Sequence, residues 1–211
     1  MSLEHEYSLL DGVNRAQVGR CLGALAAAIS SGIVFVVLTA VDLAKQWRLP
    51  VNLPPTFLSL ASAGAVFAVL YWVLDRYAWR WSLLGRLLGV PDLSGTWRCD
   101  GQSLNSDGVL VHAWQGTVTI LQSWYKIRVR LKTAQSGSDS ISAALICDPA
   151  DGYVLLYHYR NEPKIDQPDL SGHRGFAQFT FSQDRKSATG EYFNGAGRYT
   201  FGTMKLTREA A

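Results

Sequence analysis

The sequence predicts a membrane-anchored, mainly-β protein, in which a two-helix transmembrane hairpin precedes a small eight-stranded antiparallel β-barrel. Three observations lead to this prediction. Two long apolar stretches lie in the first third of the 211 residues, the rest alternates apolar and polar residues as strands do, and turn residues divide that part at short intervals. The predicted parts are an N-terminal segment (1–20), two helices with an amphipathic extension (21–90) and the barrel (92–211).

Both apolar stretches reach the length that a bilayer requires. Residues 21–41 form a run of 21 and residues 57–74 a run of 18 without a charged side chain, and about 20 apolar residues cross a hydrocarbon core. Aromatic residues typical of a membrane interface gather at the end of the second run: Tyr71, Trp72, Tyr77, Trp79 and Trp81. The alternative is a pair of buried core helices in a soluble protein, against which both lengths argue.

Basic residues predict how the hairpin is oriented. Five of them flank its outer ends and two lie between the stretches: Arg15, Arg20, Arg76, Arg80 and Arg86 against Lys45 and Arg48. Because cytoplasmic flanks carry the excess of Lys and Arg, we expect a multi-pass protein with both termini and the barrel in the cytoplasm. Cys99 and Cys147, the cysteines outside the stretches, belong to no disulfide or metal-binding pattern, which agrees with this orientation.

Small residues recur four apart in both stretches, as in Ala28/Gly32 and Gly64/Ala68. Such pairs let helix backbones approach closely in lipid. They predict either packing of the two helices within one chain or association between chains, and the sequence leaves both open. The basic, amphipathic segment 75–90 either lies in the headgroup region or extends the second helix.

Alternation predicts eight strands after residue 92, clearest in the run 126–132. The strands are expected at 93–101, 109–122, 124–134, 139–147, 152–160, 174–182, 187–194 and 199–208. Short turns between them favour an antiparallel barrel. With eight strands, side chains nearly fill a barrel or leave room for one small ligand.

The start of the barrel predicts which end is closed. Gly95-x-Trp97 resembles the opening motif of lipocalins and avidins, in which the tryptophan plugs the barrel, and Arg208 is positioned to cover it. The connections 101–108, 135–138, 161–173 and 195–198 then fall at the opposite, open end, away from the membrane. The long connection 161–173 is a candidate functional loop, because long loops in compact domains are usually functional.

Aromatic, basic and hydrogen-bonding residues gather near that open end, and they suit a compact anion that carries nucleobases. Guanidinium groups bind phosphates, aromatic rings stack on bases, and Asn161 is a candidate to read a base edge. The alternative is that the aromatic residues belong to the core and Asn161 caps the loop. The candidate ligand-binding residues are Tyr157, Tyr159, Asn161, His173, Arg174, Tyr192 and Arg198.

Other classes of function are disfavoured. No catalytic motif is present and the histidines lack metal-ligand spacing, so we expect neither an enzyme nor a metal or other cofactor. Residues 92–211 carry 13 Lys plus Arg and 12 Asp plus Glu, which argues against a DNA or RNA partner. The row Lys126, Arg128, Arg130 and Lys132 is either a solvated outer face or a source of contacts to anions.

Several motifs together resemble a known family: 157–163 (YHYRNEP), 173–175 (HRG), 190–193 (GEYF) and 197–202 (GRYTFG), preceded by two apolar spans. The chain resembles the two-transmembrane, β-strand-rich effectors of bacterial CBASS anti-phage defence. The resemblance implies a barrel that binds a cyclic dinucleotide made by a partner nucleotidyltransferase. It also implies a homo-oligomer that disrupts the bacterial inner membrane. Two rivals remain, a lipocalin-like carrier of an apolar ligand and a scaffold that binds no small molecule.

Overall fold

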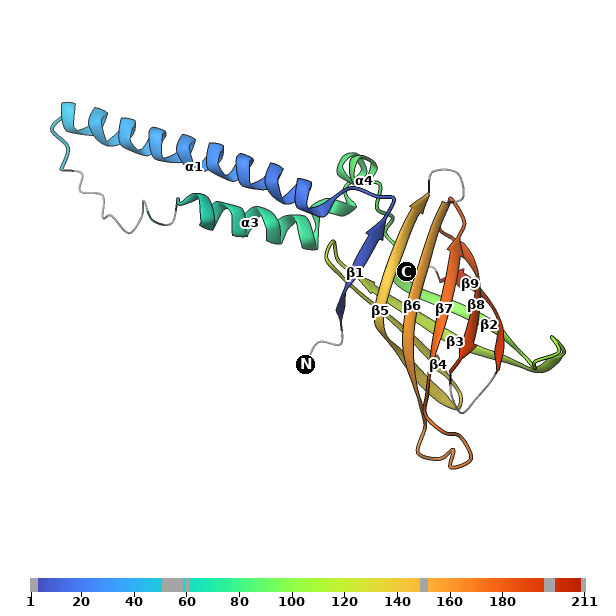
Figure 1. Ribbon diagram of the computed structural model, residues 1–211. Helices are drawn as coiled ribbons and strands as arrows, with labels where there is room; N and C mark the ends of the chain where they lie inside the picture. Colours follow the sequence, from blue (N-terminus) through green and yellow to red (C-terminus); the bar gives the residue numbers. More distant parts are fainter. Residues whose placement is uncertain (1–3, 51–58, 60, 149–151, 196–199, 210–211) are drawn as a thin grey trace. The chain divides into compact units, whose positions relative to one another are not determined.

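The computed structural model describes residues 4–50, 59, 61–148, 152–195 and 200–209, which fall into two compact units (Figure 1). One unit, Val13–Trp81, is helical. The other combines Met1–Gly12 with Ser82–Ala211 and contains every strand of the described chain. Residues 4–12 therefore belong with the barrel, although a separate N-terminal segment (1–20) was predicted.

Helix α1 (Arg15–Gln46) begins where the Asn14 side chain accepts a hydrogen bond from the Ala16 amide at 2.9 Å. Its 32 residues rise about 48 Å, more than the ~30 Å of a bilayer core. Most of its surface is exposed in the isolated chain. By length and composition it is the one helix among the described residues that qualifies as a membrane span.

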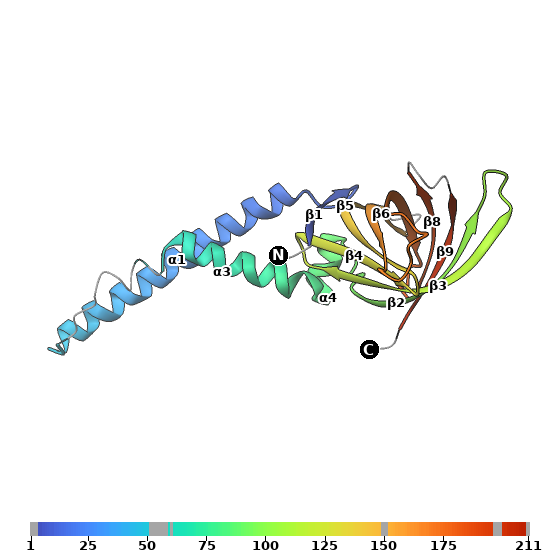
Figure 2. The same cartoon turned by 90° about the horizontal axis from the view of Figure 1, so that it is seen from below.

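Helix α3 (Ala63–Arg76) has 14 residues, which rise about 21 Å. The predicted second span, 57–74, begins at residues outside the described part of the chain. Helices α1 and α3 lie side by side in both views (Figures 1 and 2), and the Ser30 hydroxyl donates to the Ala61 carbonyl. A Cβ added to Gly32 or Gly64 would meet no described atom within 4 Å, so these two glycines do not take part in the packing of α1 against α3.

The remaining helical segments are short. The 3-10 helix η1 (Ala78–Arg80) follows α3, and helix α4 (Ser82–Leu88) is the first element after it that belongs to the barrel unit. Leu88 and Val90 are buried, and Gly89 between them has a φ of +64°, a backbone conformation that suits glycine. This turn ends α4 ahead of Pro91.

All eight predicted strands are present, joined by a ninth. They are β2 (Gly95–Leu104), β3 (Leu110–Gln122), β4 (Lys126–Thr133), β5 (Ser136–Asp148), β6 (Gly152–Pro163), β7 (His173–Phe181), β8 (Ser187–Asn194) and β9 (Phe201–Arg208). These eight pair antiparallel, and the sheet closes into a barrel in the order β1-β4-β3-β2-β9-β8-β7-β6-β5. Turns 148–152 and 195–198 of the prediction lie partly outside the described residues.

The additional strand, β1 (His5–Leu10), corrects the prediction of eight strands that are all antiparallel. A bulge in β5 between Ser140 and Ser142 parts β5 from β4, and β1 enters the seam. It pairs antiparallel with β4 at two positions and parallel with β5 from Tyr7↔Ala143 to Leu10↔Ile146. At the point of separation, the Ser140 hydroxyl lies 2.7 Å from His5 Nε2 and accepts from the Val129 amide at 2.9 Å.

Trp97 closes one end of the barrel, as predicted. Its side chain is fully buried, its Nε1 donates to the Leu93 carbonyl at 3.2 Å, and the Arg208 guanidinium lies 5.2 Å from the ring centre. Gln122 completes this end, because its side chain accepts from the Leu93 amide and donates to the Pro91 carbonyl. The packing around Trp97 therefore closes this end of the barrel, and only the opposite end of the described barrel is left to admit a ligand.

The basic row on β4 faces outward, opposite the buried Ile127 and Val129. Arg128 and Arg130 approach the Asp139 carboxylate on β5 to 2.7 and 3.5 Å. The row therefore lies on the outer face of the barrel, as the first interpretation predicts, but two of its four cations contact the Asp139 carboxylate and help to hold β4 against β5.

Candidate ligand-binding pocket

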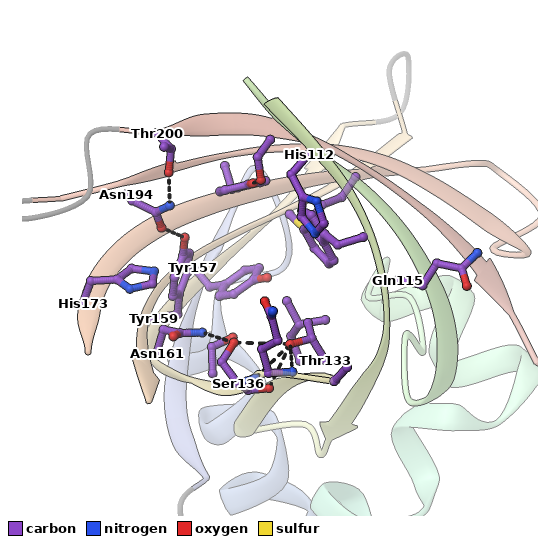
Figure 3. Close-up of a pocket in the computed structure, with 18 residues that line it drawn as sticks. His112, Gln115, Thr133, Ser136, Tyr157, Tyr159, Asn161, His173, Asn194 and Thr200 are labelled. Atoms are coloured by element: carbon purple, nitrogen blue, oxygen red, sulfur yellow. Dashed lines mark hydrogen bonds between the residues drawn. The ribbon is translucent and has the colours of Figure 1, made fainter. Parts of the chain in front are cut away.

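A pocket of about 300 Å³ opens at the end of the barrel opposite Trp97 (Figure 3). Its walls come from β2 to β9, because inward-facing residues near the open ends of neighbouring strands converge there. The lining residues are Ser103, His112, Trp114, Gln115, Leu131, Thr133, Ala134, Gln135, Ser136, Ser138, Tyr157, Tyr159, Asn161, His173, Tyr192, Asn194, Thr200 and Met204.

Five of the seven predicted site residues line this pocket: Tyr157, Tyr159, Asn161, His173 and Tyr192. Arg174 does not, because it follows His173 on β7, where successive side chains alternate between faces, and it is exposed outside the barrel. The placement of Arg174 at the pocket is thus a correction to the sequence analysis. Arg198 lies outside the described residues.

Tyr157 forms the floor of the pocket. Its ring packs on Phe179 with centroids 5.8 Å apart, its side chain is 3% exposed, and its hydroxyl points into the middle of the pocket (Figure 3). Burial, and to a smaller extent Tyr159 and Cys99, raises the pKa of Tyr157 well above its usual value. The hydroxyl therefore stays protonated at physiological pH and can donate a hydrogen bond.

One wall of the pocket carries a chain of hydrogen bonds. The Tyr159 hydroxyl donates to Asn194 Oδ1 at 2.8 Å, and Asn194 Nδ2 donates to the Thr200 hydroxyl at 2.7 Å. His173 meets the Tyr159 ring edge to face, with centroids 6.5 Å apart. This network fixes the position of Tyr159 before any ligand binds, which reduces the entropy that a ligand must overcome.

A second cluster lies where β4 turns into β5. Asn161 Nδ2 donates to the Ser136 hydroxyl at 3.1 Å, and that hydroxyl is 3.3 Å from Thr133 Oγ1. Thr133 Oγ1 also accepts from the Ser136 amide at 3.0 Å. Asn161, which is 9% exposed, is therefore held by side chains of the neighbouring hairpin rather than acting as a cap for the long loop.

The opposite wall combines an aromatic pair with a hydroxyl pair. Trp114 and Tyr192 pack edge to face at 6.0 Å, and the Tyr192 hydroxyl lies 2.6 Å from Ser103 Oγ. His112 stands at the exposed margin of this wall. Together the walls offer aromatic faces and neutral hydrogen-bonding groups.

Hydroxyl, amide and aromatic side chains make up most of the pocket lining, which also includes two histidines. Among the described residues that line the pocket there is no Lys, Arg, Asp or Glu. A purely apolar ligand would leave many polar groups unpaired here, and burying them in that way is costly. The pocket instead suits a ligand with flat, hydrogen-bonding parts that are themselves neutral.

Sequence reasoning missed several lining residues, including Ser103, His112, Trp114, Ser136 and Asn194. Each occupies an inward position near the open end of its strand or in the adjoining turn. The signal that could have found them is strand alternation counted from the buried Trp97, applied to every strand rather than to the most chemically distinctive residues alone.

A closed barrel with a polar, aromatic pocket at one end and a long apolar helix in the same chain defines a membrane-associated receptor class. Comparison with known protein families supports this assignment to a membrane-associated receptor class. Residues 16–80 match the family described as "Cap15, TM helices" and residues 88–208 match "Cap15, cyclic dinucleotide receptor domain". The chain belongs to the Cap15 family.

A curated relative extends this result to nearly the whole chain. CD-NTase-associated protein 15 of Yersinia aleksiciae is 44% identical over 204 residues, which cover 97% of each protein. This match and the two family matches confirm the family resemblance drawn from the sequence motifs.

Proposed function

We propose that this protein is a membrane-anchored CBASS effector that binds a cyclic dinucleotide in the open-end pocket. One observation carries the proposal: a pre-ordered pocket of tyrosines and neutral hydrogen-bonding side chains lies within the region that matches the cyclic dinucleotide receptor domain. Flat aromatic faces stack on bases, and side-chain amides and hydroxyls pair with base edges. A nucleotidyltransferase working with the protein would supply the ligand, and the protein itself would act by binding rather than by catalysis.

Titration calorimetry of the full-length chain in detergent tests ligand binding. We expect saturable binding of at least one cyclic dinucleotide and none of a long-chain fatty acid. Tyr192→Ala should weaken binding by about tenfold or more, because base stacking contributes about 1–3 kcal/mol per ring. Arg174→Ala, on the outer face, is the matched control and should leave the affinity nearly unchanged. Fatty-acid binding would favour the lipocalin-like carrier, and no binding of either would favour the scaffold.

The proposed anchor is a hairpin of two membrane-spanning helices with the barrel in the bacterial cytoplasm. The length of α1, the family match over residues 16–80 and the basic flanks support it. A fluorescent-protein fusion at the C-terminus should fluoresce in intact cells, whereas a periplasmic reporter at the same end should stay inactive. The opposite pattern would reverse the orientation.

Ligand binding is proposed to assemble the helices of several chains and so to disrupt the inner membrane. The exposed glycine faces of α1 and α3 support this, because a Cβ on Gly32 or Gly64 meets no neighbour among the described residues of the same chain. Replacing Gly32 with leucine should leave ligand affinity intact but reduce ligand-induced oligomer size and toxicity in cells. If oligomer size does not respond to ligand while toxicity does, assembly is not the mechanism.

A further inference from the structure

Three tyrosines line the pocket, and their hydroxyls differ in what they contact. The Tyr159 hydroxyl donates to Asn194 and the Tyr192 hydroxyl pairs with Ser103, at 2.8 and 2.6 Å. The Tyr157 side chain is 3% exposed, yet its hydroxyl has no hydrogen-bond partner among the described residues. That hydroxyl points into the cavity, between the side that carries Asn161 and the side that carries His112 (Figure 3).

The surroundings of Tyr157 determine what kind of group can reach it. Phe179 packs against its ring, and the lining includes the apolar side chains of Leu131 and Met204. No Lys or Arg lines the described pocket, so a phosphate placed at the floor would be desolvated without a countercharge. A nucleobase is neutral and flat, and its edge carries hydrogen-bond acceptors. It can therefore lie among these side chains without a countercharge and still accept a hydrogen bond from the Tyr157 hydroxyl.

We infer that the pocket takes one nucleobase of its ligand edge-first, and that the Tyr157 hydroxyl donates a hydrogen bond to an acceptor on that base. The phosphates then stay toward the mouth, where the described lining includes His112 and His173. Tyr157 is thereby a specificity-determining residue, since a base without an acceptor at that position leaves the hydroxyl unpaired. This inference rests on the proposed function.

Tyr157→Phe tests the inference, because it removes the hydroxyl and keeps the ring that packs on Phe179. Calorimetry on the full-length protein in detergent would use cyclic di-AMP, cyclic di-GMP, cyclic di-UMP and cyclic GMP–AMP. These share a ribose–phosphate ring and differ in their bases. Leaving a buried acceptor on the ligand unpaired should lower the affinity for the best ligand by about 5-fold or more, and it should narrow the spread of Kd among the four ligands.

Tyr153→Phe is the matched control, because it makes the same change on the same strand away from the pocket lining. It should leave every Kd unchanged. A loss below about 5-fold in Tyr157→Phe overturns the inference. An equal loss for all four ligands also overturns it, because the hydroxyl then contacts the shared ribose–phosphate ring. If the wild-type protein binds none of the four, the proposed function itself fails, which is a separate result.

Discussion

Replacing Tyr7 with alanine is expected to loosen β1 from the seam between β4 and β5. The Tyr7 side chain is 3% exposed, and its hydroxyl lies 3.4 Å from both the Ser123 carbonyl and Gln122 Nε2. Truncating a buried aromatic residue to alanine costs about 3–5 kcal/mol. Because β1 lies at a seam that can partly collapse, we expect the lower value, about 3 kcal/mol, in the free energy of opening this strand.

Hydrogen exchange measured by mass spectrometry on the full-length protein reports this opening directly. The β5 residues that pair with β1, from Ala143 to Ile146, should exchange about 100-fold faster in Tyr7→Ala, since about 1.4 kcal/mol corresponds to tenfold. Leu10→Ala is the matched control on the same strand, because Leu10 is 44% exposed and its loss should cost less than about 0.5 kcal/mol. Equal exchange rates at β5 in the two variants would refute the assignment of β1 to the barrel core.

Three further outcomes follow from the barrel's packing. Gly202→Ala should prevent stable folding, since the added Cβ would overlap the main chain of β2; urea denaturation would show it, and a wild-type midpoint would contradict it. Asp139→Asn should lower the free energy of unfolding by about 1–2 kcal/mol, because two β4 arginines lose their partly buried partner; an unchanged midpoint in the same assay would contradict that. Burial raises the pKa of the Cys99 and Cys147 thiols to about 12 and about 11, so both stay protonated and unreactive at pH 8. A thiol reagent should then leave Cys99 and Cys147 unmodified in the folded protein, and labelling of either would argue against this packing.

Alternation along the chain identified eight strands because each has one face against the core, and that pattern repeats every second residue. Trp97 and Arg208 were correctly paired at the closed end because the Gly95-x-Trp97 motif resembles the opening of lipocalins, and the strands that carry them, β2 and β9, are neighbours. The strand β1 escaped detection. It has six residues with one buried side chain, and its partners lie more than 100 residues away, so no local pattern reveals it.

The candidate site was predicted in part for similar reasons. Tyr157, Tyr159 and Asn161 alternate along one strand, so identifying one as inward-facing identifies the others. Arg174 was grouped with them by its position along the chain and its charge, without regard to the face on which it lies. Its neighbours His173 and Gly175 point inward, which places Arg174 outside.

The sequence by itself determined the order of apolar helices and strands, the closed end of the barrel and the family, because these depend on local periodicity and short motifs. Only the tertiary structure decided that β1 joins the barrel and that the pocket lining is neutral. It also decided that the hydroxyl of one of the three pocket tyrosines meets no hydrogen-bond partner among the described residues. Those features depend on which side chains meet across distant strands, and register and shear set these contacts rather than the composition of any one segment.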